Sequence, residues 1–484
     1  MVVLNLQSIK LSNIYIFFCI STNNKFTESY LGGFLMNNKY SDLFDILIKA
    51  YLEDHFEETL NRIMTCHEAS PQETFEIITS LCGVSLEFDN NFVQNLKKAI
   101  SQYSVNEAIV KKLSCCNGEC THDKNSKFPC EKACPLHAIY FDEEQNSTVI
   151  DEERCIKCGF CIDACKKGRI LDLVEFMPVL NLIKENKTVI AAVAPSIIGQ
   201  FGEDVTLDQL RAALIKIGFT DMIEVAFTAD MLSIKEAVEF DRHVKNEDEF
   251  LITSCCCPMW VGMIRKVYDD LIEDVSPSVS PMIAAGKVIK KINKDAKVVF
   301  IGPCIAKKAE AKEKDLEGII DFVLTYAELK EIFNAYEIDP EKLEGMPTKE
   351  YASKGGRLYG RTGGVSIAVS DVIKELYPEK HKYFKAVQGN GIKECKKLLN
   401  DILDGKVKGT FLEGMGCVGG CVGGPKKIIS PEEGRKALDE SAKEALIRVP
   451  THSAAMDKVL KDIGIESLED FKDEKKTEIF ERKF

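Results

Sequence analysis

The sequence predicts an α/β active-site domain whose strand ends carry cysteines, preceded by a small α+β ferredoxin-like domain and a helical segment. Three apolar runs stop abruptly at cysteines: residues 251–260 (LITSCCCPMW), 297–304 (KVVFIGPC) and 410–421 (TFLEGMGCVGGC). Ligands of open α/β sheets lie beyond the carboxyl ends of the strands, so these ends can point four thiolates at one locus. We interpret the locus as a buried iron–sulfur centre. The alternative, that buried cysteines are only small hydrophobes, does not explain four placements beside Pro or Gly.

Length and composition narrow the class of protein. The chain has 484 residues, 19 cysteines and a formal net charge of -13. This length allows roughly two to four domains, and the acidic balance argues against nucleic acid as a partner. No apolar run is long enough to span a bilayer, so no membrane association is expected. Clustered cysteines without a secretory cleavage pattern predict metal ligands in a reducing, cytoplasmic setting.

The first 35 residues differ from the rest. Residues 14–20 (IYIFFCI) are too short to span a membrane and lack a cleavage site after them. Gly32 and Gly33, closely preceding Met36, can be the translation of a purine-rich ribosome-binding sequence. We therefore expect residues 1–35 to be a mis-annotated start, with translation beginning at Met36; a leader is the alternative. Residues 36–113 have helical periodicity and no assigned chemistry.

Residues 114–175 are expected to form the ferredoxin-like domain. Cys155, Cys158, Cys161 and Cys165 follow the C-x2-C-x2-C-x3-C spacing of bacterial ferredoxins. Cys130 and Cys134, followed by Pro135, end a second run that Cys120 and either Cys115 or Cys116 complete; His122 could replace one of these ligands. In two-cluster ferredoxins the fourth cysteine of each run ligates the other cluster. Two [4Fe–4S] clusters are therefore predicted, one held by Cys165, Cys120, Cys130 and Cys116 or Cys115, the other by Cys134, Cys155, Cys158 and Cys161.

Residues 176–430 are expected to form the catalytic domain. From Lys187 onward, strands and helices alternate: residues 188–197 predict a buried strand that ends at Pro195, and residues 206–217 a capped amphipathic helix. Residues 431–484 are expected to be a charged helical tail with a solvated surface.

Three segments in this order resemble the signature motifs of the [FeFe]-hydrogenases: residues 253–260 (TSCCCPMW), 302–310 (GPCIAKKAE) and 411–421 (FLEGMGCVGGC). The resemblance covers roughly residues 114–425. It implies an H-cluster, a cubane [4Fe–4S] joined through one cysteine sulfur to a diiron unit with CO, CN⁻ and an azadithiolate bridge. The implied cubane ligands are Cys257, Cys304 and Cys417, and Cys421 is the implied bridging ligand.

The resemblance also implies the residues around the diiron unit. The family's proton relay maps onto Cys256, Glu236, Glu239 and Ser276. Elementary chemistry agrees, because splitting H2 needs a nearby base and a dry route for a proton, which a thiol followed by carboxylates of raised pKa can supply. Lys307 matches a lysine that pairs with one cyanide, and such a donor would offset the cluster's negative charge. The remaining implied contacts are Pro195 and Ser196 to the other cyanide, Glu310 as a supporting carboxylate, and Met415 packed near the diiron unit.

The chain departs from the family's pattern at three positions. Cys255 stands where serine is usual, Gly302 replaces a methionine, and Met282 replaces a glutamine. A thiol is a weak hydrogen-bond partner, so we hypothesise that the loop moves and that Cys256 can bind a vacant oxidised iron and exclude O2. Gly302 and Met282 are expected to leave room for this movement. The alternative is that Cys255 is a tolerated substitute for serine.

The expected function is reversible hydrogen oxidation, H2 ⇌ 2H⁺ + 2e⁻, with a ferredoxin as electron partner and with maturation proteins that assemble the H-cluster. A hydrogen sensor with the same cluster is one alternative, although it should carry a signalling domain or a broken relay. A non-catalytic iron–sulfur assembly or relay protein is another, and it would keep the cubane ligands but lose the diiron pocket. The direction of the reaction does not follow from the sequence.

Overall fold

The computed structural model describes residues 40–66, 70–102, 108–114, 116, 120, 127–253 and 255–483. The expected start at Met36, Cys115 and His122 therefore lie outside the described residues. Within the described part of the chain, no helix is long and apolar enough to cross a membrane.

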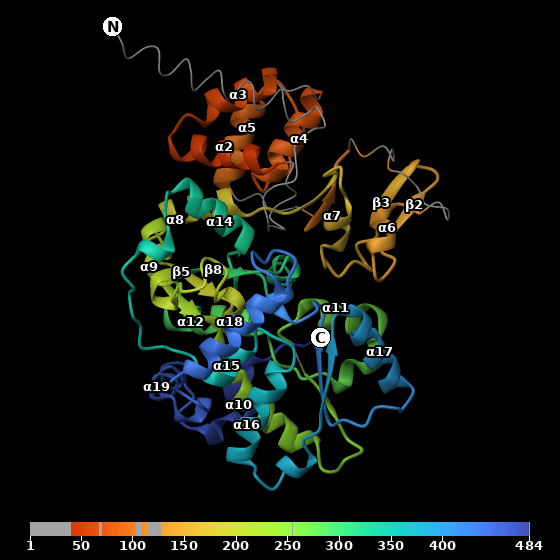
Figure 1. Cartoon of the computed structure of the whole chain (residues 1–484), viewed down its shortest axis with the longest axis vertical. Coiled ribbons are helices and arrows are strands. Elements are labelled where there is room, and N and C mark those ends of the chain that lie inside the picture. The colour runs from red at the N-terminus through yellow and green to blue at the C-terminus, as the bar shows by residue number, and fades with distance from the viewer. Residues whose placement is uncertain are drawn as a thin grey trace.

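The described residues of the N-terminal segment form four helices, which pack against the outer side of the catalytic domain, at the top of Figure 1. Phe44, Leu47 and Leu96 are fully buried in one core with Phe176 of the catalytic domain. Helix α4 begins after Ser70, whose side chain accepts a hydrogen bond from the Glu73 amide, and a proline occupies its first turn. The helices are α2 (Ser41–Leu52), α3 (Phe56–Cys66), α4 (Pro71–Leu81) and α5 (Phe92–Gln102).

The ferredoxin-like part consists of two short antiparallel pairs and two short helices. Strand β1 (Val110–Lys112) pairs with β4 (Ile170–Asp172), and β2 (Ile139–Asp142) pairs with β3 (Ser147–Ile150). The helices are α6 (Pro129–Ala133) and α7 (Phe160–Ala164). The expected helical segment up to residue 113 is therefore wrong at its end: residues 110–112 form a strand, because Val110 packs under the ferredoxin-like core beside Ile162 and Ile170.

The catalytic domain contains two parallel sheets, so its α/β class is confirmed. The larger sheet has the order β6-β5-β8-β9, and the smaller one the order β10-β11-β7. The three strands that precede the cysteine motifs belong to different sheets: β8 to the larger, β7 and β11 to the smaller. Their bounds are β5 (Val189–Val193), β6 (Asp221–Glu224), β7 (Leu251–Ile252), β8 (Lys297–Gly302), β9 (Phe322–Thr325), β10 (Ala386–Asn390) and β11 (Phe411–Met415).

Helix α10 (Val225–His243) runs through the middle of this domain, and every residue from Val225 to Phe240 is buried. A helix that is apolar on all sides is the usual occupant of such a place. Helix α10 nevertheless carries four buried charged residues, Asp230, Lys235, Glu236 and Glu239. The other helices are α8 (Phe176–Glu185), α9 (Leu207–Ile217), α11 (Pro258–Val267), α12 (Pro281–Ile292), α13 (Ala306–Ala311), α14 (Tyr326–Ala335), α15 (Lys354–Leu358), α16 (Gly364–Leu376) and α17 (Ile392–Leu403).

The C-terminal segment contains α18 (Pro431–Glu444), α19 (Ala454–Asp462) and α20 (Glu474–Thr477). The expectation of a solvated tail is wrong, because Phe471 and Phe480 are buried in the same core as Trp260. Their rings stack with centroids 6.1 Å apart. Apolar residues of a charged segment thus fix it to the domain, while most of its lysines and glutamates are exposed.

Candidate functional site

The four cysteines expected to hold the H-cluster converge from both sheets. Cys257 caps the start of α11, Cys304 follows β8, and Cys417 and Cys421 lie on the loop after β11. Burial, together with the neighbouring Cys304, Cys257 and Cys421, raises the pKa of Cys417 well above its usual range. Burial and the neighbouring Cys257 and Cys304 likewise raise the pKa of Cys421 to about 12. The four thiols therefore surround one buried locus.

This set of thiols fits an iron–sulfur cluster. Burial raises the pKa of the Cys304 thiol to about 11, so these thiols stay protonated unless a cation draws off their protons. Bound iron would supply that charge, because coordination to a metal deprotonates a thiol. The Gly416 amide donates to the Cys257 sulfur at 3.3 Å, a contact that stabilises a thiolate ligand. Among the described residues, no three His, Cys, Asp or Glu side chains are placed to hold a single metal ion.

Lys307 and its partners lie beside this locus. Burial opposes the charge of Lys307, but Glu310 at 2.6 Å outweighs it, so the lysine pKa is raised and the side chain stays cationic. Cys256 and Cys304 are further charge neighbours of Lys307. A buried cation is thus available for an anionic ligand next to the thiols.

The remaining predicted contacts come from strand ends. Pro195 and Ser196 form the turn η1 (Pro195–Ile197) after β5, and Met415, only 1% exposed, ends β11. The Ser196 hydroxyl lies 2.8 Å from the Tyr326 hydroxyl. Burial raises the pKa of Tyr326, and Cys421 adds to this rise, so the pair faces the Cys421 side of the locus.

Glu236, Glu239 and Ser276, the relay residues expected from the sequence, come together between α10 and the strand β7. Ser276 donates to Glu239 at 2.5 Å, and Thr253 donates to Glu236. Burial raises the pKa of Glu236 to about 8, and the charge of Glu239 adds to the effect. A carboxyl group of this kind can take and release a proton near neutral pH.

The adjacent thiols of the first motif face opposite ways. Burial and the neighbouring Cys421 and Cys257 raise the pKa of Cys256 well above its usual range, which places its thiol on the cluster side. Burial and the neighbouring Glu236 and Glu239 do the same for Cys255, which places its thiol on the relay side. The Cys255 sulfur donates to the Ser276 carbonyl at 3.0 Å. The extra cysteine thus contacts the relay serine.

The room expected at Gly302 is already filled. A Cβ atom built there would lie 2.6 Å from the Phe300 ring and 3.4 Å from Ala194. The expectation that this glycine leaves space for loop movement is therefore wrong. Met282 is buried at 1% exposure on α12. The hypothesis that Cys256 protects the iron from O2 stays a prediction. Its remaining support is the thiol of Cys255 at a position where serine is usual.

The raised pKa of Glu236 predicts a dependence of stability on pH. From about pH 5 to pH 8 the folded protein keeps a proton that the unfolded chain has released, so the free energy of unfolding should fall as pH rises, by up to about 1.4 kcal/mol per unit. Glu236→Gln is neutral throughout, so urea unfolding of this variant should show a flatter slope. Asp230, whose pKa burial raises to about 7, keeps part of the slope. The exposed Glu344→Gln is the control, and equal slopes in the two variants would contradict the prediction.

The ferredoxin-like cysteines fall into two groups. Burial raises the pKa of Cys130 to about 11, and its neighbouring thiols are Cys165 and Cys116. Burial raises the pKa of Cys158 to about 12, and its neighbouring thiols are Cys155 and Cys134. These neighbours agree with the expected exchange of fourth ligands. The remaining thiols join the same groups, Cys120 with Cys165 and Cys116, and Cys161 with Cys158, Cys155 and Cys134.

The thiol groups form a series that leads to the catalytic locus. Cys161 of the second group neighbours Cys130 of the first, and Cys417 of the catalytic locus neighbours Cys158. The domains are tightly fitted there, since a Cβ atom at Gly159 would lie 2.7 Å from Ile305. Clusters bound in these positions would make a continuous electron route.

Several polar residues at the site were not expected from the sequence. Thr253 and Tyr326 hydrogen-bond to predicted residues, and Tyr359 has Glu236 and Cys256 among its charge neighbours. Lys235 pairs with Glu239 and with Glu481 of the C-terminal segment. The spacing of Lys235 and Glu239, one helical turn apart, was visible in the sequence. It indicates a functional pair only once both residues are known to be buried.

Family profiles and relatives match the same regions. A profile described as the iron only hydrogenase large subunit, C-terminal domain, matches residues 187–425, and a 4Fe–4S binding domain profile matches residues 148–168. Iron hydrogenase 1 of Clostridium pasteurianum is 31% identical over 61% of this chain and 67% of its own length. The periplasmic [Fe] hydrogenase large subunit of Nitratidesulfovibrio vulgaris is 31% identical over 62% of this chain and 84% of its own.

Other matches widen the comparison. The NADP-reducing hydrogenase subunit HndD of Solidesulfovibrio fructosivorans is 27% identical, and the chain spans only 55% of it. Cytosolic iron-sulfur assembly component 3 of Rattus norvegicus is 24% identical over 59% of this chain and 73% of its own. A solved [FeFe]-hydrogenase structure shares the fold with a TM-score of 0.55 at 23% identity, covering 64% of this chain and 99% of that one.

Fold, cysteine motifs and matched profiles together define an iron–sulfur protein with a hydrogenase-type catalytic domain. The chain belongs to the iron-only, or [FeFe], hydrogenase family.

Proposed function

We propose that this chain catalyses H2 ⇌ 2H⁺ + 2e⁻ at an H-cluster. The observation that carries the proposal is the convergence of Cys257, Cys304, Cys417 and Cys421 on one buried locus beside Lys307 and Cys256. An assembly or relay protein needs the cubane ligands. It does not need the Lys307 cation and the Cys256 thiol next to those ligands.

The side chains at the locus have different proposed roles. Cys257, Cys304, Cys417 and Cys421 would hold the H-cluster, which supplies the electron-rich iron at which H2 is split. Lys307, held by Glu310, offers an ammonium to an anionic ligand of that group, and Ser196 with Tyr326 offers hydroxyl groups on the Cys421 side.

Protons leave through the protein. Cys256 takes the proton on the cluster side and Glu236 receives it, since the pKa of about 8 lets Glu236 accept and release a proton at working pH. Ser276 and Glu239 continue the route. Glu236, Glu239 and Ser276 are buried and Cys256 is half-buried, so bulk water has little access to these transfers.

Electrons would pass through two [4Fe–4S] clusters bound by the ferredoxin-like cysteines, and we propose a ferredoxin in the cytoplasm as their carrier. Residues 111–170 contain ten basic and ten acidic side chains in a chain of net charge -13. An acidic carrier is therefore repelled least at this module.

Reversing Lys166 and Lys167 to Glu should slow reduction of the enzyme by ferredoxin about tenfold at low salt, because steering by charge acts mainly on the rate of encounter. Both side chains are exposed. The measurement is turnover with ferredoxin and with a small dye across a salt series. Lys475→Glu with Lys476→Glu on α20, an exposed lysine pair outside the ferredoxin-like part, is the control. Equal slowing with dye and ferredoxin would contradict docking at this surface.

Infrared spectroscopy of anaerobic protein made together with its maturation proteins tests the proposed function. Bands of metal-bound CO and CN⁻, together with turnover of H2, are the expected result. Cluster bands without turnover would favour the sensor alternative. Iron–sulfur absorption without CO and CN⁻ bands would favour an assembly role, to which the 24% identity with the rat assembly component points.

A further inference from the structure

Lys235 is a buried cation placed between two carboxylates. Its side chain is 2% exposed on α10, where it donates to Glu239 one turn further on. The same Nζ lies 3.4 Å from Oε1 of Glu481, whose side chain is 28% exposed. The ammonium therefore joins the last buried acid of the relay to an acid in contact with solvent.

Backbone bonds hold Glu481 in this position. The Val279 amide donates to the Phe480 carbonyl at 2.8 Å, and the Arg482 amide donates to the Pro277 carbonyl at 2.9 Å. Lys287 donates to the Glu481 carbonyl at 3.0 Å. This antiparallel pairing runs along the segment that directly follows Ser276, the residue that donates to Glu239.

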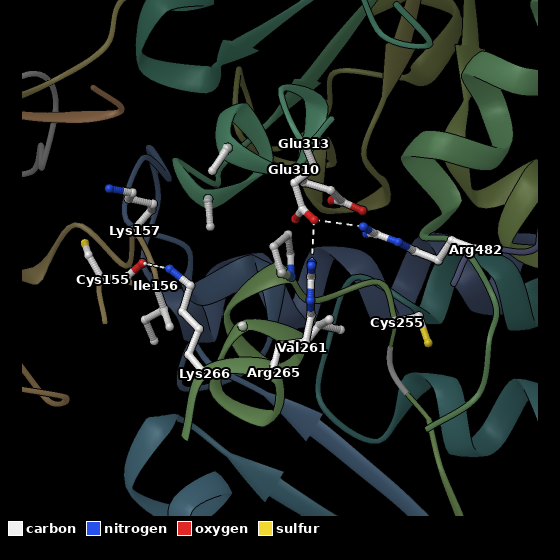
Figure 2. Close-up of a pocket in the computed structure, with 14 residues that line it drawn as sticks. Cys155, Ile156, Lys157, Cys255, Val261, Arg265, Lys266, Glu310, Glu313 and Arg482 are labelled. Carbon is white, nitrogen blue, oxygen red and sulfur yellow. Dashed lines mark hydrogen bonds and ion pairs between the residues drawn. The ribbon is translucent and has the colours of Figure 1, made fainter. Parts of the chain in front are cut away.

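Arg482 anchors the same turn from the other side. It donates to Glu313 at 2.8 Å and to Asp315 at 3.1 Å. Figure 2 shows Arg482 and Arg265 reaching Glu313 across a cavity of about 370 Å³ that Cys255 also lines. These contacts on both sides fix the backbone at Glu481 and so hold its carboxylate near Lys235.

We propose that Lys235 and Glu481 form the solvent end of the proton path, so that the C-terminal segment carries the last proton-bearing group of the enzyme. The proposal rests on the proposed function and extends it by two residues that are 246 positions apart in the chain. Glu239 alone does not reach solvent, because its side chain is 6% exposed.

The transfer balances as a proton relay without redox chemistry. The Lys235 ammonium gives one N–H proton to the Glu481 carboxylate, and the resulting amine takes the proton of the Glu239 carboxylic acid. Glu481 then releases its proton to water, and Lys235 ends as it began. During hydrogen production the same steps run in reverse.

Two variants test the path by dye-driven turnover on protein whose CO and CN⁻ bands match the wild type. Glu481→Gln should lower turnover about tenfold, less than the roughly 10²–10⁴-fold typical of a lost acid or base, because water can partly replace an exposed group. Lys235→Arg should lower it at least as much, since a guanidinium keeps the positive charge but does not give up a proton. The exposed Glu478→Gln, in the same turn, is the matched control and should be unaffected.

Two further measurements distinguish a loss of proton transfer from a structural effect of the substitution. High concentrations of a small weak acid should restore turnover of Glu481→Gln. In cluster-free protein, amide hydrogen exchange of residues 277–282 should stay as slow in Glu481→Gln as in the wild type. Wild-type turnover in either variant, or lost turnover with faster exchange and no rescue, overturns the proposal. A wild type without CO and CN⁻ bands overturns the proposed function itself and this extension with it.

Discussion

Replacing Cys256 by alanine should leave the cluster in place and abolish most of the turnover. The thiol faces the cluster side, with Cys421, Cys257 and Lys307 as its charge neighbours. Its removal takes away the proposed first proton acceptor and no expected metal ligand. A missing general acid or base typically costs roughly 10²–10⁴-fold in rate. Turnover with a reduced dye, normalised to the infrared CO and CN⁻ bands, measures the loss.

Cys82→Ala is the matched control for this variant. Cys82 is a buried thiol at the end of α4 in the N-terminal helices, whereas Cys256 is half-buried. Both changes remove one sulfur from a packed site, so Cys82→Ala should lower stability at least as much as Cys256→Ala. Only Cys256→Ala should lose activity. Near-wild-type turnover of Cys256→Ala, or equal losses in both variants, would refute its role as proton carrier.

The cysteine positions could be predicted because chemistry and sequence coincide there. An apolar run that stops at Cys257, Cys304 or Cys417 reports both a buried strand and a ligand at its end. The sequence could not tell that β8 belongs to a different sheet from β7 and β11, because strand order depends on pairings between distant segments. The predicted locus is compatible with this arrangement, since Cys257, Cys304 and Cys417 follow strands of both sheets and are neighbours.

The C-terminal segment could not be predicted in the same way. Its many lysines and glutamates are typical of a solvated surface, and they outnumber the residues that bury it, such as Met456, Leu460, Phe471 and Phe480. Glu481 pairs with Lys235 only because the chain returns to pair with residues 277–279. A contact of this kind depends on the complete fold, and neither residue lies in a recognised motif.

Replacing Lys308 by methionine should lower the free energy of unfolding by about 3–5 kcal/mol, because it leaves a carboxylate buried without its cation. Lys308 and Glu328 are 0% and 1% exposed and lie 2.8 Å apart. Lys308 also donates to the Leu173 carbonyl at 2.5 Å, in the segment that joins the ferredoxin-like part to the catalytic domain. Glu328 accepts from the Thr325 and Glu175 amides, each at 2.7 Å. One buried pair thus fixes the junction between the ferredoxin-like part and the catalytic domain.

The measurement is anaerobic urea unfolding followed by the fluorescence of Trp260, the single tryptophan of the chain, which is fully buried in the catalytic domain. The double variant Lys308→Met with Glu328→Gln removes both charges, so it should lose less than the sum of the two single variants. Lys342→Met breaks an exposed pair with Asp339 and should leave the unfolding midpoint unchanged. If Lys308→Met unfolds at the wild-type midpoint, the buried pair does not hold the junction, and the backbone pairing of β1 with β4 must position the module alone.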